Sequence, residues 1–185
     1  MDASRDDLTE LREEIRGCKR CRLSESRTKA APNQGDVDAD VLVVGKMVGY
    51  ADDEVGLPYQ GEAGRHLDYA LEANGASRDD VFLTNLTRCH PPESRDPRSD
   101  ELDRCAPYFE RELAIVSPSY VVALGRLVAR RLLGQDVDVE TARGELHPYN
   151  TLTYTGEVLV TYNVGAAMYD RSKRESIADD LSLVL

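Results

Sequence analysis

The chain has 185 residues, with 34 acidic against 23 basic side chains and a formal net charge of −11. Its 41% hydrophobic content is that of a globular protein, and the length suits one domain over residues 1–185 rather than two. No apolar run approaches the roughly 18 residues that cross a membrane, and the polar start resembles no signal peptide, so we expect a soluble, cytoplasmic protein that is a monomer.

Apolar strands and helical patterns alternate along the chain. Because such strands are buried on both faces, they predict an α/β fold, a three-layer α/β/α arrangement around a central, mostly parallel four-stranded sheet. In chain order we expect a helix at about 6–17, a strand at 41–45, a helix from Ala63 to Gly75, a strand at 81–86, a helix after a Ser99 cap, a strand at 120–125, a helix at 126–134, a strand at 157–163 and a helix at 172–184.

The site of such a fold lies beyond the carboxyl ends of its strands. That rule points to four segments, at 45–49, 85–89, 125 and 163–167. At ordinary salt, the acidic composition argues against nucleic acid as a ligand of these segments, because the field of the protein repels phosphates. The composition also fits a salt-loving organism, where strong screening makes local basic clusters matter more than net charge.

Four cysteines stand at Cys18, Cys21, Cys89 and Cys105. Cytoplasmic cysteines are seldom disulfides, and the C-x-x-C spacing of the first pair lets two thiolates face one metal centre. Zinc would satisfy the spacing. The alternative is a redox pair at the first two positions and two small buried hydrophobic side chains at the others. The second pair brackets a proline-rich, charged loop at 87–105 that can bury little apolar surface.

Several stretches of the chain together resemble one known family. They are GKMVGYADDEVGLPYQGEAGRHLD (45–68), TNLTRCHPPESRDP (84–97), SPSYVVALGRLVARRLLG (117–134) and the four-cysteine spacing. In this order and at these distances they resemble the iron–sulfur uracil-DNA glycosylases, usually called family 4, from Cys18 to about Tyr162. By this resemblance the four cysteines bind a [4Fe–4S] cluster, which holds the loop at 87–105 in place of a core.

The reaction expected of that family is hydrolysis of the N-glycosidic bond to a flipped-out uracil in base-excision repair. The resemblance makes Tyr59, in place of the family's Phe, the ring on which the base stacks, and Asn85 the amide that reads its Watson–Crick edge. The alternatives are a core aromatic for Tyr59 and a strand-end cap for Asn85. Gly45 and Gly49 would allow close backbone approach to the base.

Two catalytic positions depart from the family. The acidic residue of its first motif is Lys46 here, and the histidine after its last strand is Asn163. Asn163 still offers a neutral donor to an oxyanion, whereas Lys46 disfavours a positive sugar and favours a departing anion. Asp53, beside Asp52, could supply the missing carboxylate, although a solvated acidic turn also explains it.

The resemblance also places Arg88, Arg95 and Arg98 against DNA phosphates as a local basic patch. The alternative is a solvated loop whose acidic residues cancel these charges. We therefore expect a DNA glycosylase-like hydrolase of N-glycosyl bonds that removes uracil or another deaminated base from DNA. The alternative function is that of a diverged member, which binds nucleic acid or an altered base without hydrolysis.

Overall fold

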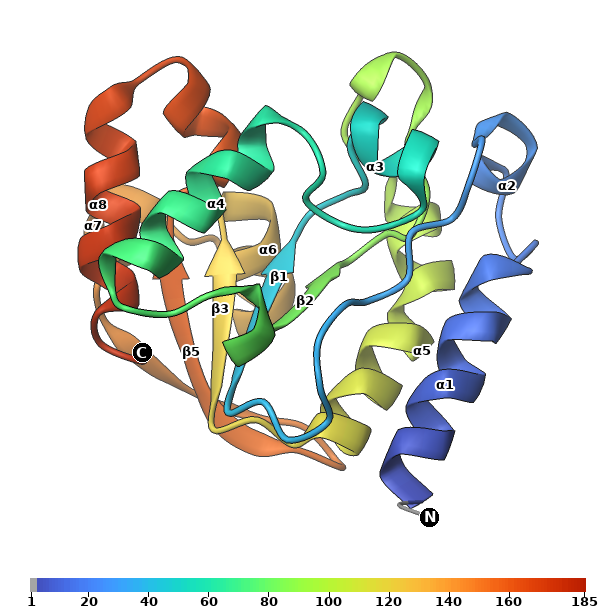
Figure 1. Cartoon of the computed structure of the whole chain (residues 1–185), viewed down its shortest axis with the longest axis horizontal. Helices are drawn as coiled ribbons and strands as arrows, with labels where there is room; N and C mark the ends of the chain where they lie inside the picture. The colour runs from blue at the N-terminus through green and yellow to red at the C-terminus, as the bar shows by residue number, and fades with distance from the viewer. Residues whose placement is uncertain (1–2) are drawn as a thin grey trace.

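A five-stranded sheet lies at the centre of the computed structural model, which describes residues 3–185 (Figure 1). The strand order is β2-β1-β3-β5-β4, with β4 antiparallel to β5 and the other neighbours parallel. The strands are β1 (Val41–Gly45), β2 (Phe82–Asn85), β3 (Tyr120–Leu124), β4 (Leu146–Asn150) and β5 (Thr155–Thr161). The predicted α/β class and mostly parallel sheet are confirmed.

The prediction of four strands was wrong, because it missed β4. This strand contains Pro148, and its residues are alternately exposed and half-buried. It therefore lacks the continuous apolar run by which the other strands were predicted. It pairs with β5 on one side only, and Pro148 lies opposite Glu157. Proline is tolerated at a sheet edge, where one side of the strand has no ladder to complete.

Helices cover both faces of the sheet (Figure 1). Helices α4 and α8 pack on one face and α5 and α6 on the other, which makes the three layers. No helix within residues 3–185 is long and apolar enough to span a bilayer. The helices are α1 (Ala3–Arg16), α2 (Leu23–Ser26), α3 (Tyr50–Val55), α4 (Glu62–Ala73), α5 (Ser99–Val116), α6 (Arg126–Leu133), α7 (Val139–Ala142) and α8 (Arg171–Leu181), with 3-10 turns η1 (Arg78–Asp80), η2 (Pro92–Ser94) and η3 (Val164–Met168).

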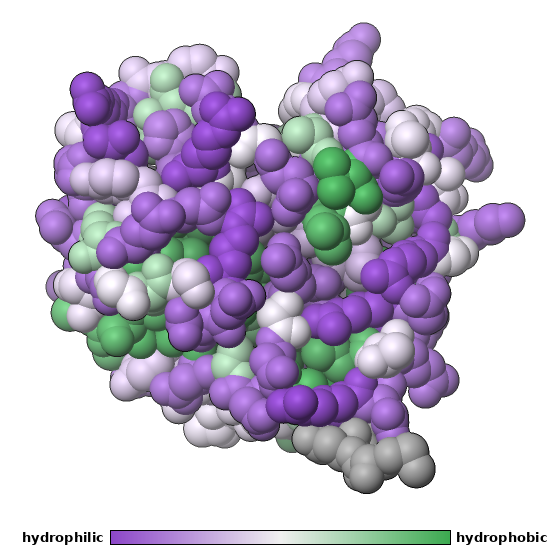
Figure 2. All heavy atoms as spheres, viewed as in Figure 1, coloured by the Kyte–Doolittle hydropathy of each residue, from purple (hydrophilic) through white to green (hydrophobic). Residues whose placement is uncertain are grey.

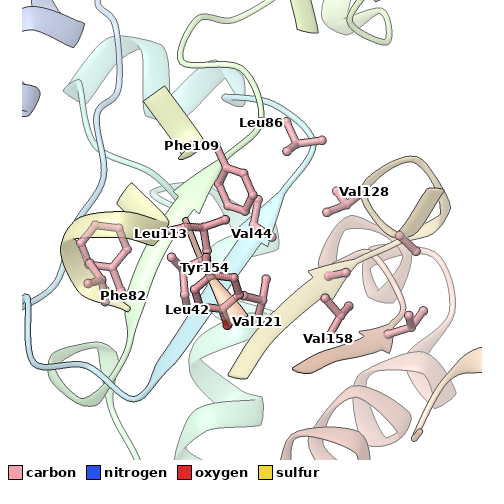
Figure 3. Packing of buried hydrophobic residues seen from close by; sticks show 14 of the residues in the cluster. Leu42, Val44, Phe82, Leu86, Phe109, Leu113, Val121, Val128, Tyr154 and Val158 are labelled. Atoms are coloured by element: carbon pink, nitrogen blue, oxygen red, sulfur yellow. The ribbon is translucent and has the colours of Figure 1, made fainter. Parts of the chain in front are cut away.

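Alternation along β1 divides its side chains between the two layers. Leu42 and Val44 join the cluster that contains α5 and α6, and Val41 and Val43 join the one that contains α4 and α8. Because successive side chains of a strand point to opposite faces, a continuous apolar strand must be covered on both. Figure 3 shows the first cluster, where Leu42 and Val44 lie near Leu113 of α5.

A third, smaller cluster lies between α1 and α5, beside the sheet. Leu11 and Ile15 of α1 pack there with Leu23 of α2 and Tyr108 of α5, and the cysteines lie in the same cluster. The opening helix therefore has a defined place: it covers the segment that carries the cysteines.

The carboxyl ends of the four parallel strands meet at one edge of the sheet, the upper edge in Figure 1. The connection from β1 to β2 runs to one side of β1, and β3 lies on its other side, so the strand order reverses between β1 and β3. Ligands of open α/β sheets bind at such a point. Figure 2 shows a notch in the surface at this edge, between the part with α4 and α8 and the part with α3.

Candidate functional site

Gly45, Asn85 and Tyr59 meet at the carboxyl ends of β1 and β2. Gly45 pairs in register with Asn85. A β-carbon at position 45 would lie 2.5 Å from Oδ1 of Asn85 and 2.7 Å from the hydroxyl of Tyr59. The absence of a side chain at position 45 therefore lets the other two residues converge.

Tyr59 is buried in a strained backbone conformation. Its φ is 58°, which L-residues other than Asn and Asp rarely adopt. Arg78 Nη2 donates to its carbonyl at 2.6 Å, and its own hydroxyl donates to the carbonyl of Thr84 at 2.9 Å. Burial, and next the nearby Asp52, raises the pKa of Tyr59, so the phenol stays neutral. The hydroxyl that phenylalanine lacks thus has a partner inside the fold.

The side-chain nitrogen of Asn85 is buried and has no hydrogen-bond partner in the described part of the chain. Asn85 itself is 3% exposed. An unpaired buried donor costs about 1–3 kcal/mol. The amide stands at the sheet edge beside Gly45, and its donor is left unused by the described part of the chain.

Asn163 follows β5 and caps η3. Its Oδ1 accepts the N–H of Gly165 at 2.8 Å, which fixes the orientation of the amide. It packs against Gly125, whose φ is 89° and whose added β-carbon would lie 3.0 Å from Cβ of Asn163. The amide nitrogen of Asn163 has no partner within residues 3–185, so this residue presents a donor and not an acceptor.

Asp53 is not a free carboxylate in this structure, and its catalytic role stays a prediction. Both its oxygens accept the backbone N–H of Thr28, and Oδ1 also accepts that of Lys29. Asp53 is 6% exposed. It ties the first turn of α3 to the segment that follows α2, because a buried carboxylate needs donors.

Gly49 is also committed within the fold. Its N–H donates to Oδ2 of Asp52 at 2.9 Å, and Oδ1 of Asp52 accepts the N–H of Gln60 at 2.7 Å. The N–H of Gly49 is therefore already paired, and the close approach of its backbone to a base stays a prediction. Asp52 closes the loop between β1 and α4.

Lys46 forms an ion pair with Asp96 of the proline-rich loop. The Lys46 side chain is 29% exposed and that of Asp96 65%. The carbonyl of Lys46 also accepts the N–H of Thr87 at 3.3 Å. Lys46 therefore joins the loop after β1 to the loop after β2.

Arg88, which the resemblance places against DNA phosphates, is buried in the structure. It is 1% exposed, and its Nη2 donates at 2.8 Å to Glu112, which is also fully buried. Glu112 further accepts from Thr84 and from Asn33, each at 2.8 Å. Arg88 therefore holds α5 against the end of β2 and does not reach a phosphate.

The other two predicted phosphate ligands differ from each other. Arg95 donates through both terminal nitrogens to Glu101 at 2.8 and 2.6 Å, and this bond is the main reason why the pKa of the Glu101 carboxyl is lowered. Arg95 thus anchors the loop to the first turn of α5. Arg98 is exposed and forms no ion pair in the described part of the chain, so its predicted contact with DNA stays a prediction.

The four cysteines come together from three distant segments. All are free thiols within one apolar cluster: Cys89 and Cys105 are buried, and Cys18 and Cys21 are half-buried. Burial raises the pKa of Cys89, which Arg27 lowers in part and Cys21 and Cys18 raise further. Burial also raises the pKa of Cys105 to about 12. Each buried thiol thus lies within electrostatic range of Cys18.

Several polar groups surround these sulfurs that the motifs did not indicate. Arg27 Nη1 donates to Sγ of Cys89 at 3.0 Å, and Arg27 Nη2 donates to the carbonyl of Cys18 at 2.7 Å. The N–H of Arg20 lies 3.5 Å from Sγ of Cys18. Among residues 3–185, no three His, Cys, Asp or Glu side chains are placed to hold a single metal ion. Neither Arg27 nor the partners of Arg88 belong to a spacing pattern that sequence reading could have found.

Comparison with known proteins agrees with the motifs. Residues 32–182 match the family described as the uracil DNA glycosylase superfamily. The chain is 33% identical over 184 residues to the type-4 uracil-DNA glycosylase of Sulfurisphaera tokodaii, a match that covers 97% of this chain and 84% of that protein. It is 33% identical over 184 residues to that of Saccharolobus solfataricus, with 97% and 85% covered. It is 32% identical over 181 residues to that of Pyrobaculum aerophilum, with 96% and 92% covered.

Proposed function

The chain belongs to the uracil DNA glycosylase superfamily, and on this premise we propose that it removes uracil, or another deaminated base, from DNA by hydrolysing the N-glycosidic bond. The single observation that carries the proposal is the buried amide nitrogen of Asn85, which has no partner within residues 3–185 and stands beside Gly45 and Tyr59. A flipped-out base with a carbonyl on its Watson–Crick edge supplies the missing acceptor. We further propose that the protein acts as a cytoplasmic monomer.

The chemistry follows from where charge develops. Cleavage of the bond leaves negative charge on the departing base, and a fixed donor aimed at that charge lowers the barrier. The amide nitrogen of Asn163 is such a donor, because the N–H of Gly165 holds its oxygen. Tyr59 would stack on the base. Its hydroxyl is already paired with Thr84, so the ring can present its face at no further polar cost.

A specific observation favours a second function, binding of an altered base without hydrolysis. The acidic residue of the family's first motif is Lys46 here, and neither Asp52 nor Asp53 is free to replace it, because backbone N–H groups occupy both. A site without a carboxylate lacks one means of stabilising a positive sugar or activating water. Recognition through Asn85 does not need that carboxylate.

We also propose that Cys18, Cys21, Cys89 and Cys105 hold a [4Fe–4S] cluster. The donor set fits: the four thiols share one apolar cluster, and Arg27 donates to Sγ of Cys89 as outer partners of thiolate ligands do. A cluster is larger than one ion, so its ligands stand farther apart than those of zinc. The group supplies a covalent tie between the C-x-x-C segment, the proline-rich loop and α5. Iron and acid-labile sulfide analysis of anaerobically purified protein tests this, and zinc alone would overturn it.

The decisive experiment for the function is release of free base from uracil-containing single- and double-stranded DNA, at salt concentrations up to molar. The wild type is expected to release uracil. Asn85→Ala should release it about 10–100-fold more slowly, because about 1.5–3 kcal/mol of hydrogen bonding to the base is lost. Uracil-dependent binding without release would establish the second function instead. Neither binding nor release, with uracil, hypoxanthine or xanthine, would overturn both.

A further inference from the structure

A small basic pocket lies away from the base site. It has a volume of about 280 Å³ and lies between the end of α1, the segment after α2 and the end of α3. Its lining includes Arg16, Arg27, Thr28 and Lys29, with Val55 on its apolar side. No Asp or Glu occurs among the described residues that line it. In a chain with a net charge of −11, a cavity lined by three cations and no acid favours an anion over a cation.

The backbone and one charge of this pocket are fixed by the fold. Asp53 accepts the N–H groups of Thr28 and Lys29, which holds the segment in place. Arg27 is held by Sγ of Cys89 and by the carbonyls of Cys18 and Arg16, at 3.0, 2.7 and 3.3 Å. Because the Arg27 side chain is already held in position, it loses little further conformational entropy when an anion binds.

Two further cations can reach an anion in this pocket. The side chain of Lys29 is exposed and forms no ion pair in the described part of the chain. Among the described residues, Arg16 pairs only with Glu13, and both side chains are exposed, at 48% and 68%, so this pair is weak and can exchange. The hydroxyl of Thr28 has no hydrogen-bond partner within residues 3–185. These groups match the several acceptor oxygens and the charge of a phosphate.

The pocket lies at the end of α3, the helix that follows the loop after β1. Helix α3 begins directly after Gly49 and ends at the pocket, and its six residues (Tyr50–Val55) span about 9 Å at the usual rise. Helix α3 therefore links the loop after β1, which begins at Gly45, to the pocket.

We propose that this pocket binds one backbone phosphate of DNA, with Arg16 and Lys29 contacting its oxygens and Thr28 donating a hydrogen bond. The proposal rests on the proposed function only in that DNA lies across the carboxyl edge of the sheet. The guanidinium of Arg27, held by Cys89 and Cys18, adds a fixed positive charge to the pocket lining. The net charge of the chain weakens this contact at ordinary salt but does not prevent it, because repulsion from charges farther than about 8 Å is largely screened.

The test is the salt dependence of binding to uracil-free, single-stranded DNA by the intact holo-protein. The double variant Arg16→Gln/Lys29→Gln is expected to lower the slope of log affinity against log salt by about 0.7 for each phosphate that it no longer neutralises. Arg130→Gln is the matched control, since Arg130 is an exposed arginine on α6 without an ion pair in the described chain. The control should leave the slope unchanged. An unchanged slope in the double variant would overturn the proposal.

Inorganic phosphate distinguishes a DNA phosphate from a free anion. Titration of the wild type with phosphate is expected to give no binding in the millimolar range. Tight phosphate binding that the double variant loses, with an unchanged DNA slope, would overturn the assignment to DNA. This test is independent of base release. The double variant can change the salt slope even if the wild type releases no uracil, and it can leave the slope unchanged even if the wild type releases uracil.

Discussion

Gly45 and Asn85 lie opposite each other at the carboxyl ends of β1 and β2, so close that a β-carbon on residue 45 would come within 2.5 Å of Oδ1 of Asn85. Side-chain contact, and not a left-handed backbone, therefore requires glycine here. The same missing side chain admits the hydroxyl of Tyr59. The geometry of the proposed base site depends on a residue that contributes no functional group.

Gly45→Ala should therefore displace Asn85 or Tyr59 and impair the site. Overpacking of this kind costs about 1–3 kcal/mol, so base release should fall at least about tenfold while the protein still folds. Gly17→Ala is the matched control, because an added β-carbon there meets nothing nearer than 3.8 Å. The measurements are base release and the urea unfolding midpoint. Unchanged release in Gly45→Ala would contradict the described contact.

Asn163→Asp separates the two functions of the Asn163 amide. Aspartate keeps the oxygen that accepts the N–H of Gly165 at 2.8 Å, so η3 should remain capped. It replaces the donor by a negative oxygen, and loss of one donor to a developing anion costs about 2.7–4 kcal/mol. We expect base release to fall about 100–1,000-fold with little change in stability. Asn163→His should raise release if the loop accepts the ring, and equal activity of Asp and Asn would exclude a donor role.

The ion pair between Lys46 and Asp96 should affect DNA binding more than stability. Both side chains are partly exposed, and such pairs contribute about 0–1 kcal/mol. Asp96→Asn releases Lys46 for a DNA phosphate and removes one repulsive charge. The affinity for DNA should increase, and the slope of log affinity against log salt should steepen by up to about 0.9 on duplex DNA. A weaker affinity would mean that Asp96 itself contacts the substrate.

Arg88→Met should destabilise the protein strongly. It leaves the carboxylate of Glu112 buried without its cation, and breaking such a pair costs about 3–5 kcal/mol. Arg126→Gln is the control, because Arg126 pairs with Asp136 on the surface with both side chains about two-thirds exposed. Urea unfolding at neutral pH measures both. A stable Arg88→Met variant with a reduced salt slope would instead support the phosphate contact predicted from the sequence.

The bond from Arg95 to Glu101 predicts a specific loss of stability in acid. It lowers the pKa of Glu101 below its ordinary value of 4.5, so the unfolded state binds more protons than the folded state in this range. Stability from this carboxylate is therefore complete above about 4.5 and is lost as pH falls through the folded pKa. The difference in unfolding free energy between wild type and Glu101→Gln should shrink over this range. Parallel curves would show that Glu101 does not titrate as described.

The sequence by itself determined the long elements and the identity of the reactive side chains. The strand VLVVG (41–45) was found with its predicted bounds, and β3 and α6 lie within one residue of theirs. These elements are signalled locally, by apolar runs and helical periodicity. The convergence of the four cysteines in one apolar cluster was also predictable, but only from the resemblance to the iron–sulfur uracil-DNA glycosylases.

Only the tertiary structure decided what each charged residue does. The sequence suggested a DNA contact for Arg88 and a catalytic acid for Asp53. In the fold, Arg88 pairs with Glu112, which is 24 positions away in the sequence. Asp53 pairs with the backbone of Thr28, which is 25 positions away. Residues 146–150 form strand β4 because their backbone pairs with β5 at the edge of the sheet. The role of a charged residue or a proline depends on the groups that surround it after folding. Those groups come from distant parts of the chain, so the local sequence does not reveal them.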